Sequence, residues 1–252
     1  MKTVLITGAT SGFGWATAAA FLRQNHRVII TGRRQHRLQA FIDQHKEQAA
    51  NILPLCFDVR NREEVEKTLH SMPDEWKNIH ILVNNAGLSR GLTEIQNGEY
   101  ADWEEMIDTN IKGLLYVSKV VINFMIERGI EGHIINVGST AGHEVYPKGN
   151  VYCATKHAVD AITKGMRLDL LAHNIKVSTI DPGMSETEFS IVRFHGDVER
   201  AKKVYEGFEP LRPEDIAQCI LFMANAPKHV NVAQILLLPA AQANTVTVKR
   251  NL

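Results

Sequence analysis

The sequence predicts an α/β fold in which a doubly wound parallel sheet of about seven strands has helices on both faces. Short runs of β-branched and other apolar residues alternate with longer amphipathic stretches, which is typical of repeated β-α units. Most of the short runs are apolar throughout, as expected for strands buried on both faces. The 252 residues, 44% apolar and 22% charged, can bury a large core, so we expect a single domain spanning residues 1–252.

The expected strands follow the β-branched runs and end at glycine, aspartate, asparagine or proline. They cover residues 3–7, 27–31, 52–57, 79–84, 133–137, 176–180 and 234–238. The amphipathic stretches between them predict helices at residues 12–24, 35–47, 62–71, 102–128, 151–173 and 213–224. The last helix has a clear beginning, because Pro213 suits a first turn and Glu214 and Asp215 complement the positive end of the helix dipole.

Composition excludes several classes of partner and site. The 28 basic side chains balance the 28 acidic ones and form no cluster larger than short pairs such as Arg33-Arg34, so we expect no nucleic-acid partner. The three cysteines include no Cys-x-x-Cys pair, which favours a reducing compartment over a disulfide framework. No two of the 11 histidines lie three or four residues apart, so we expect no metal site.

Neither end of the chain predicts a membrane segment. The apolar stretch before the first glycine is too short for the core of a signal peptide. The apolar run within residues 234–239 is far shorter than a membrane span. We therefore expect a soluble, cytoplasmic protein without a membrane partner.

A glycine-containing turn, Thr-Gly-Ala-Thr-Ser-Gly-Phe-Gly at residues 7–14, joins the first strand to the first helix. Glycines let the backbone approach a pyrophosphate closely, and the helix N-terminus offers free N–H donors and a partial positive charge. A turn that serves packing alone is the alternative, but the position directly after an N-terminal strand favours dinucleotide binding. The cofactor residues expected here are Gly8, Thr10, Ser11, Gly12, Phe13 and Gly14.

An arginine pair, Arg33-Arg34, follows the second expected strand. An NAD site places an acid at this point to hold the ribose hydroxyls, whereas arginines suit a 2′-phosphate. Solvation of a helix start is the alternative, but cations there oppose the helix dipole. We therefore expect NADP as the cofactor.

Ser139, Tyr152 and Lys156 form a pattern suited to alcohol or carbonyl redox chemistry. Residues four apart on a helix share a face, so the tyrosine and the lysine can act on one substrate. A phenol acting as a base near neutral pH needs its pKa lowered by roughly 3 units, about the effect of a cation ~4 Å away. Burial opposes this, so a second positive charge such as an oxidised nicotinamide would help. Alone, the Tyr-x-x-x-Lys pair is weak, since roughly 0.3 such pairs arise by chance in this chain.

Further motifs appear in a consistent order along the chain. They are Asp58-Val59, Asn84-Asn85-Ala86-Gly87, Asn110 and Pro182-Gly183-x-x-x-Thr187. With the glycine turn and the Ser139, Tyr152 and Lys156 pattern, they resemble the short-chain dehydrogenase/reductase family over nearly the whole chain. The resemblance implies a Rossmann-like fold.

The resemblance also implies a role for each motif. Asp58 and Val59 would lie near the adenine. The cofactor cleft would be lined by Asn85, Ala86 and Gly87, and the nicotinamide carboxamide would be held by Pro182, Gly183 and Thr187.

In such a family member the catalytic residues would be Asn110, Ser139, Tyr152 and Lys156. Ser139 would bind the substrate oxygen, Tyr152 would shuttle its proton, and Lys156 would lower the tyrosine pKa and bind the ribose. Tyr152 and Lys156 thereby also count as cofactor residues. Asn110 would hold a water that connects Lys156 to solvent.

Four segments resemble a subgroup, the NADP-dependent 3-hydroxy acid dehydrogenases, whose substrates include serine, L-allo-threonine and malonic semialdehyde. The segments are residues 31–34, 138–142, 149–152 and 186–194. A substrate carboxylate calls for a cation near Ser139 and Tyr152. Arg193 is the first candidate and Arg90 the second, although either could be a plain surface arginine. Glu186 in the same loop would repel such a substrate if it pointed inward.

Two other functions stay open at this stage. One is a broader NADPH-dependent carbonyl reductase of neutral ketones or acyl-carrier substrates. The other is a non-catalytic NADP-sensing protein on the same fold, although no residue of the catalytic pattern is missing. The resemblance also implies a homo-oligomer, with a tetramer favoured.

Overall fold

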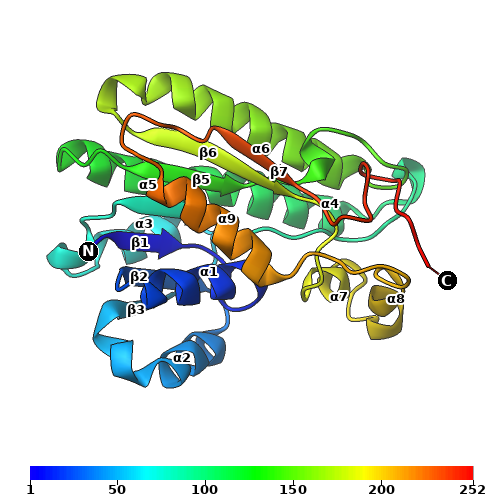
Figure 1. Cartoon of the computed structure of the whole chain (residues 1–252), viewed down its shortest axis with the longest axis horizontal. Helices are drawn as coiled ribbons and strands as arrows, with labels where there is room; N and C mark the ends of the chain where they lie inside the picture. Colours follow the sequence, from blue (N-terminus) through cyan, green and yellow to red (C-terminus); the bar gives the residue numbers. More distant parts are fainter. Residues whose placement is uncertain (252) are drawn as a thin grey trace.

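A parallel sheet runs through the middle of the molecule, which we describe from a computed structural model covering residues 1–251 (Figure 1). Within those residues the sheet has seven strands in the order β3-β2-β1-β4-β5-β6-β7. Their bounds are Thr3–Ile6 (β1), Arg27–Gly32 (β2), Ile52–Cys56 (β3), Ile81–Asn84 (β4), His133–Val137 (β5), Lys176–Pro182 (β6) and Gln234–Leu237 (β7). From β1 the chain builds outward first to one side and later to the other. The order therefore reverses between β1 and β4, which is where open α/β sheets bind ligands.

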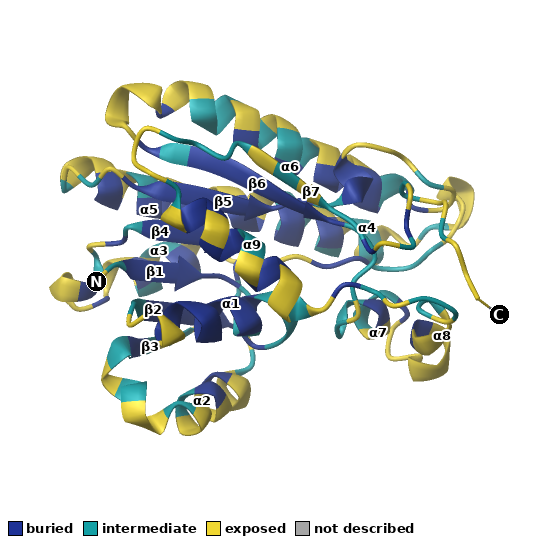
Figure 2. Ribbon diagram, viewed as in Figure 1, coloured by how far each residue is buried: buried dark blue, intermediate teal, exposed yellow. Residues whose placement is uncertain are grey.

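Helices cover both faces of the sheet. They are α1 (Gly12–Arg23), α2 (Gln35–Gln44), α3 (Arg62–His70), α4 (Tyr100–Ile107), α5 (Leu114–Glu127), α6 (Asn150–Asp169), α7 (Phe189–Arg193), α8 (Val198–Lys203) and α9 (Pro213–Asn225). Figure 2 shows that the inner strands are buried, that the edge strands β3 and β7 are partly exposed, and that the helices expose their outer faces. The predicted doubly wound fold is confirmed.

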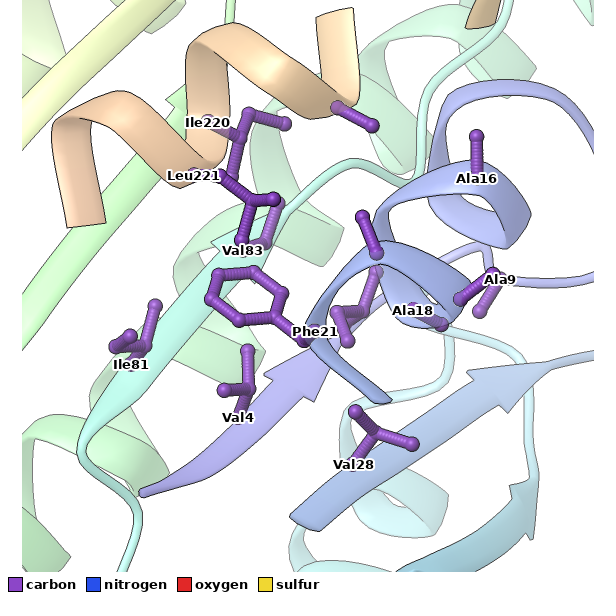
Figure 3. Close-up of a cluster of buried hydrophobic side chains, with 14 of the residues drawn as sticks. Val4, Ala9, Ala16, Ala18, Phe21, Val28, Ile81, Val83, Ile220 and Leu221 are labelled. Carbon is purple, nitrogen blue, oxygen red and sulfur yellow. The ribbon is translucent and has the colours of Figure 1, made fainter. Parts of the chain in front are cut away.

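Alternate residues of each strand supply the two core layers. Val4 and Ile6 of β1 face a cluster built with α1 and α9, in which Phe21 is fully buried (Figure 3). Leu5, between them, faces the opposite cluster, built with α3 and α5. Successive strand residues point to opposite faces, so a strand that is apolar throughout can be stabilised by helices on both sides.

The predicted helix at residues 102–128 is wrong in one respect. It is interrupted by a π-helical turn, Asp108–Gly113, between α4 and α5. Asn110 lies in this turn, and its side chain donates to the Leu88 carbonyl oxygen (2.8 Å) and accepts from the Leu88 N–H (2.9 Å). Single π-helical turns inside helices occur frequently at functional sites.

Two short helices, α7 and α8, were not predicted. Both lie at the end of the molecule toward which the carboxyl ends of the β-strands point (Figure 1). With five and six residues, they are too short to give a helical apolar period. Two other helices end earlier than predicted. The helices predicted at 35–47 and 151–173 end at Gln44 and Asp169, and a 3₁₀ turn follows each of them.

Two negative findings concern residues 1–251 only. None of the helices formed there is both long and apolar enough to cross a membrane. No group of three or more histidine, cysteine or acidic side chains in this range is placed to hold a metal ion.

Candidate active site

A cavity of about 360 Å³ lies along the carboxyl ends of the strands. It brings together most of the residues selected from the sequence. Those that line it are Gly8, Thr10, Ser11, Gly12, Phe13, Arg33, Arg34, Asp58, Val59, Asn85, Ala86, Gly87, Arg90, Ser139, Tyr152, Lys156, Pro182, Gly183 and Thr187. Three further predicted site residues do not line the cavity, although they lie close to it: Gly14, Asn110 and Arg193.

The glycine turn forms one wall and is held by Asn85. The Asn85 side-chain amide donates to the carbonyl oxygens of Thr7 (2.8 Å) and Gly8 (3.1 Å). Gly8 has a φ of +65°, and a Cβ there would lie 2.9 Å from the Ala86 Cα. A Cβ on Gly14 would lie 2.5 Å from the Asn85 Nδ2. The backbone therefore fits only with glycine at these positions.

Ser11 stands at the N-cap of α1, and its side chain makes no capping hydrogen bond. The backbone N–H groups of the first turn are therefore available at the cavity wall. A helix N-terminus of this kind is suited to an anion.

Arg34 occupies one end of the cavity and makes four side-chain hydrogen bonds. Its Nε and Nη2 donate to the Thr10 Oγ1 (3.2 and 2.9 Å), and Nη2 also donates to the Ser11 Oγ (2.9 Å). Its Nη1 donates to the Glu188 Oε2 at 2.8 Å. The guanidinium is thereby held against the glycine turn.

Arg33 lies beside it and is more open. Its side chain is 49% exposed, and its Nη1 is 3.6 Å from the Asp58 Oδ2 and 3.8 Å from the Glu105 Oε1. Partial burial would raise the pKa of Asp58, but hydrogen bonds from Arg60 and the charge of Arg33 lower it below the ordinary value. These loose contacts leave Arg33 able to bind a further anion.

Ser139, Tyr152 and Lys156 meet at the other end of the cavity. Tyr152 lies in the first turn of α6, and Lys156 lies one turn further on. The Lys156 Nζ donates to the Val137 carbonyl oxygen (2.9 Å) and lies 6.0 Å from the centre of the Tyr152 ring. The two side chains are buried, with 8% and 7% of their residue surface exposed.

Burial dominates the protonation of this end of the site. It raises the pKa of Tyr152 above its ordinary value, the nearby Tyr146 adds to this, and Arg193 and a hydrogen bond with Ser139 oppose it. It also lowers the pKa of Lys156 to about 8, against the charge of Asp181. The protein alone therefore holds Tyr152 as a neutral phenol, and further positive charge is needed before it can act as a base near neutral pH.

Asn110 supports the site from behind. Besides its two bonds to Leu88, the side chain donates to the Thr155 Oγ1 (3.0 Å), which connects the π-helical turn to α6. It is buried, with 2% of its surface exposed. All of these side-chain bonds are to protein groups, so Asn110 holds the backbone at Leu88 and the start of α6 in place.

The two arginines proposed for a substrate carboxylate are placed differently. The Arg90 Nε donates to the Glu105 Oε2 (2.5 Å) and its Nη1 to the Val192 carbonyl oxygen (2.7 Å). The Arg193 Nε donates to the Ser89 Oγ (3.0 Å), and its Cζ lies 5.2 Å from the centre of the Tyr152 ring. Arg90 is therefore paired with a carboxylate, whereas the side-chain hydrogen bonds of Arg193 within residues 1–251 go to neutral groups beside the tyrosine.

Glu186 does not point inward. It is exposed and is not part of the cavity lining. Repulsion of a carboxylate substrate, which its place in the sequence suggested, therefore has no structural basis.

Several lining residues were missed by reasoning from the sequence. They are Gly32, Phe57, Leu88, Thr109, Val137, Gly138, Ser185, Glu188, Phe189 and Val192. Most are apolar or small and carry no chemical pattern. Glu188 is the exception, since its position directly after Thr187 was the one signal that could have found it.

A family model described as short chain dehydrogenase matches residues 2–196. The chain belongs to the short-chain dehydrogenase family. The resemblance drawn from the motifs is thereby confirmed.

Three members of the short-chain dehydrogenase family are particularly similar to this one. The NADP-dependent 3-hydroxy acid dehydrogenase of Salmonella typhi is 47% identical over 241 residues, covering 95% of this chain and 96% of that protein. The serine 3-dehydrogenase of Rhizobium radiobacter is 42% identical over 241 residues, covering 96% and 95%. A structure of the closed form of serine dehydrogenase complexed with NADP⁺ matches with a TM-score of 0.93 and 45% identity, covering 99% of this chain and 100% of that one.

Gly14→Ala should destabilise this short-chain dehydrogenase by about 1–3 kcal/mol, because the new methyl group collides with the Asn85 side chain and the Gly8 carbonyl oxygen. The free energy of unfolding in urea measures the effect. Gly165→Ala is the matched control, since a Cβ there meets nothing within 4 Å on α6. That change should instead stabilise by up to about 1 kcal/mol. Equal effects of the two changes would contradict the packing argument.

Proposed function

We propose that this chain is an NADP-dependent oxidoreductase that transfers a hydride between the nicotinamide and the hydroxyl-bearing carbon of small 3-hydroxy acids. Serine, L-allo-threonine and 3-hydroxypropionate are substrates of this type. The observation that carries the proposal is that one cavity joins an arginine pair at one end to Ser139, Tyr152 and Lys156 at the other. The relatives named for NADP-dependent 3-hydroxy acid and serine dehydrogenation support it.

The residues present fit a phosphorylated dinucleotide. The glycine turn has no room for side chains on its inner surface, and the N-terminus of α1 offers unpaired N–H groups. Arg33 and Arg34 supply cations for a 2′-phosphate, which matches the NADP⁺ in the similar serine dehydrogenase structure. When bound, the cofactor supplies the hydride acceptor or donor, while the residues below handle the proton.

Tyr152 would exchange the proton of the substrate hydroxyl. Ser139 lies beside it and would hold the substrate oxygen through its own hydroxyl group. Lys156, fixed by the Val137 carbonyl oxygen, would bind ribose hydroxyls and add positive charge near the phenol. Asn110 would preserve this arrangement by fixing the start of α6 through Thr155. We also propose that Asn110 holds a water that connects Lys156 to solvent.

Arg193 would bind the substrate carboxylate. Its guanidinium has only neutral hydrogen-bond partners, Ser89 and Tyr146, and it lies over the Tyr152 ring. A carboxylate placed there would meet a cation that no acid among residues 1–251 has already neutralised. Since Arg90 is paired with Glu105, Arg193 is the better of the two candidates.

Assembly and location complete the proposal. Apolar side chains are exposed on several elements, including Leu115 of α5 (40%), Leu168 of α6 (77%) and Phe222 of α9 (64%). Covering such residues on two separate faces favours a homotetramer over a monomer. The even charge balance and the unpaired cysteines support a cytoplasmic location.

Tyr152→Phe should lower kcat for serine oxidation by roughly 10²–10⁴-fold, the usual contribution of a general acid or base. NADPH binding, followed by its fluorescence, should be retained because the ring stays in place. Tyr116→Phe, on α5 outside the cavity, is the control and should keep full turnover. Full activity of the Tyr152 variant would refute the proton-transfer role.

Replacing Arg33 and Arg34 with alanine should weaken NADP(H) binding by at least about tenfold, because two charged hydrogen-bond donors are lost. NAD(H) binding should change much less, since NAD(H) has no 2′-phosphate. Arg23→Ala, at the far end of α1, removes a similar charge outside the cavity and should leave both affinities unchanged. Equal losses for NADP(H) and NAD(H) would remove the basis for choosing NADP.

Arg193→Ala should raise the KM for a 3-hydroxy acid by roughly 10–100-fold, the cost of losing a charged hydrogen-bond partner. The KM for an uncharged ketone of similar size should stay nearly constant. The same panel tests the alternative of a broad carbonyl reductase, for which the neutral ketone would be the better substrate of the unmodified enzyme. An unchanged KM for the acid would show that Arg193 is not the anchor.

A further inference from the structure

The loop after β6 is tied to the arginine end of the cavity by one acidic side chain. Glu188 comes directly before α7, and its Oε2 accepts from the Arg34 Nη1 at 2.8 Å. Its Oε1 lies 3.6 Å from the Arg37 Nη2. Partial burial would raise the pKa of Glu188, but the hydrogen bond and charge of Arg34 lower it below the ordinary value. Glu188 is therefore ionised at neutral pH.

This contact bridges the cavity. Glu188 and Thr187 belong to the lining on the loop side, and Ser11 and Gly12 belong to it on the side of the glycine turn. The two sides come close together, since a Cβ on Gly12 would lie 3.4 Å from the Thr187 Cγ2. The loop thus lies against the glycine turn, and the Arg34–Glu188 pair fastens it there.

The hydrogen bonds of Arg34 leave room for a ligand. Its Nε and Nη2 donate to the hydroxyl oxygens of Thr10 and Ser11. The Ser11 hydroxyl is in turn hydrogen-bonded to Glu188, whereas the hydrogen of the Thr10 hydroxyl is free to donate to a ligand. Only Nη1 reaches Glu188, and its second N–H is not used in that bond. Arg34 can therefore hold Glu188 and a phosphate at the same time, with Arg33 as a second cation.

The helix α7 carries this connection to the substrate end. Glu188 precedes its first residue, and Arg193, beside the Tyr152 ring, is its last. The C-terminal end is also fixed, because the Arg193 carbonyl oxygen accepts from the Gly91 N–H at 2.9 Å. A helix of five residues spans only about 7 Å, so fixing Glu188 limits where Arg193 can lie.

We propose that Glu188 is a positioning residue that clasps α7 onto Arg34, so that retention of the cofactor and placement of Arg193 depend on one ion pair. The inference rests on the proposed NADP-dependent function and deepens it. A ligand that extends from the arginine end toward Tyr152 lies beneath α7 and leaves only when the clasp opens. A ligand confined to the arginine end does not lie beneath α7.

Glu188→Gln tests the clasp, because it removes the charge and keeps the shape. NADPH dissociation, followed by stopped-flow fluorescence, should become roughly 3–10-fold faster, as expected for a half-exposed but well-aligned charged pair. The affinity for 2′,5′-ADP, which has the 2′-phosphate but no nicotinamide half, should stay equal or increase. The KM for serine should rise with the NADPH dissociation rate, while kcat changes less.

Glu186→Gln is the matched control. It removes the same charge from the same loop, but Glu186 is exposed and makes no ion pair among residues 1–251. It should leave the NADPH dissociation rate and the affinity for 2′,5′-ADP unchanged. Thermal unfolding of the two variants should agree within a few degrees, which separates positioning from a general loss of stability.

The proposal is overturned if Glu188→Gln leaves NADPH dissociation unchanged, or if NADPH and 2′,5′-ADP affinities change by the same factor. Tighter binding of both ligands would mean that Glu188 merely repels the 2′-phosphate. Failure of the proposed function is distinguishable, because the unmodified protein would then prefer a neutral ketone to serine, whereas the NADPH dissociation rate and the 2′,5′-ADP affinity would still report on the clasp.

Discussion

Two hydrogen bonds from the Asn85 side chain, to the carbonyl oxygens of Thr7 and Gly8, connect the ends of β1 and β4, the two neighbouring strands at which the strand order reverses. At the ends of β1 and β4 the chain turns to opposite faces, and this divergence opens the cavity. Thr7 adds to the connection, since its hydroxyl oxygen accepts from the N–H groups of Asn85 (3.0 Å) and Ala86 (2.9 Å). The glycine turn can approach β4 so closely only because these bonds satisfy its backbone.

The chemistry of the site follows from a different constraint, which is the burial of a phenol and an ammonium group at the other end of the same cavity. Neither Tyr152 nor Lys156 is paired with an acid by direct contact, and burial disfavours the charged form of each. Such a site is electrostatically incomplete without its ligands. If Tyr152 acts in proton transfer as proposed, the arrangement would link activity to occupancy, because the positive charge of a bound oxidised nicotinamide would stabilise the ionised phenol.

Reasoning from the sequence reached the fold, the family and most of the cavity lining because these depend on local patterns. Strands buried on both faces, a glycine turn after β1 and a tyrosine and lysine one helical turn apart can be recognised without knowing their neighbours. The contact between Arg34 and Glu188 joins residues 154 positions apart, so no local pattern predicts it. The sequence already ranked Arg193 before Arg90, but the ion pair between Arg90 and Glu105, which supports that order, could not be predicted because Glu105 is one acid among many in the sequence.

The π-helical turn between α4 and α5 also had no sequence pattern, yet it sets the rotation of everything beyond it. Each residue turns an α-helix by about 100°, so deleting one residue from Asp108–Gly113 to restore regular winding would rotate α5 by that angle relative to α4. Met106 of α4 packs in the cluster around Tyr152, whereas Val117 and Val121 of α5 pack under the sheet. The extra residue in the π-helical turn thus changes the rotation of α5 relative to α4. As a result, α4 directs its apolar residues toward the cluster around Tyr152, while α5 directs its own toward the sheet.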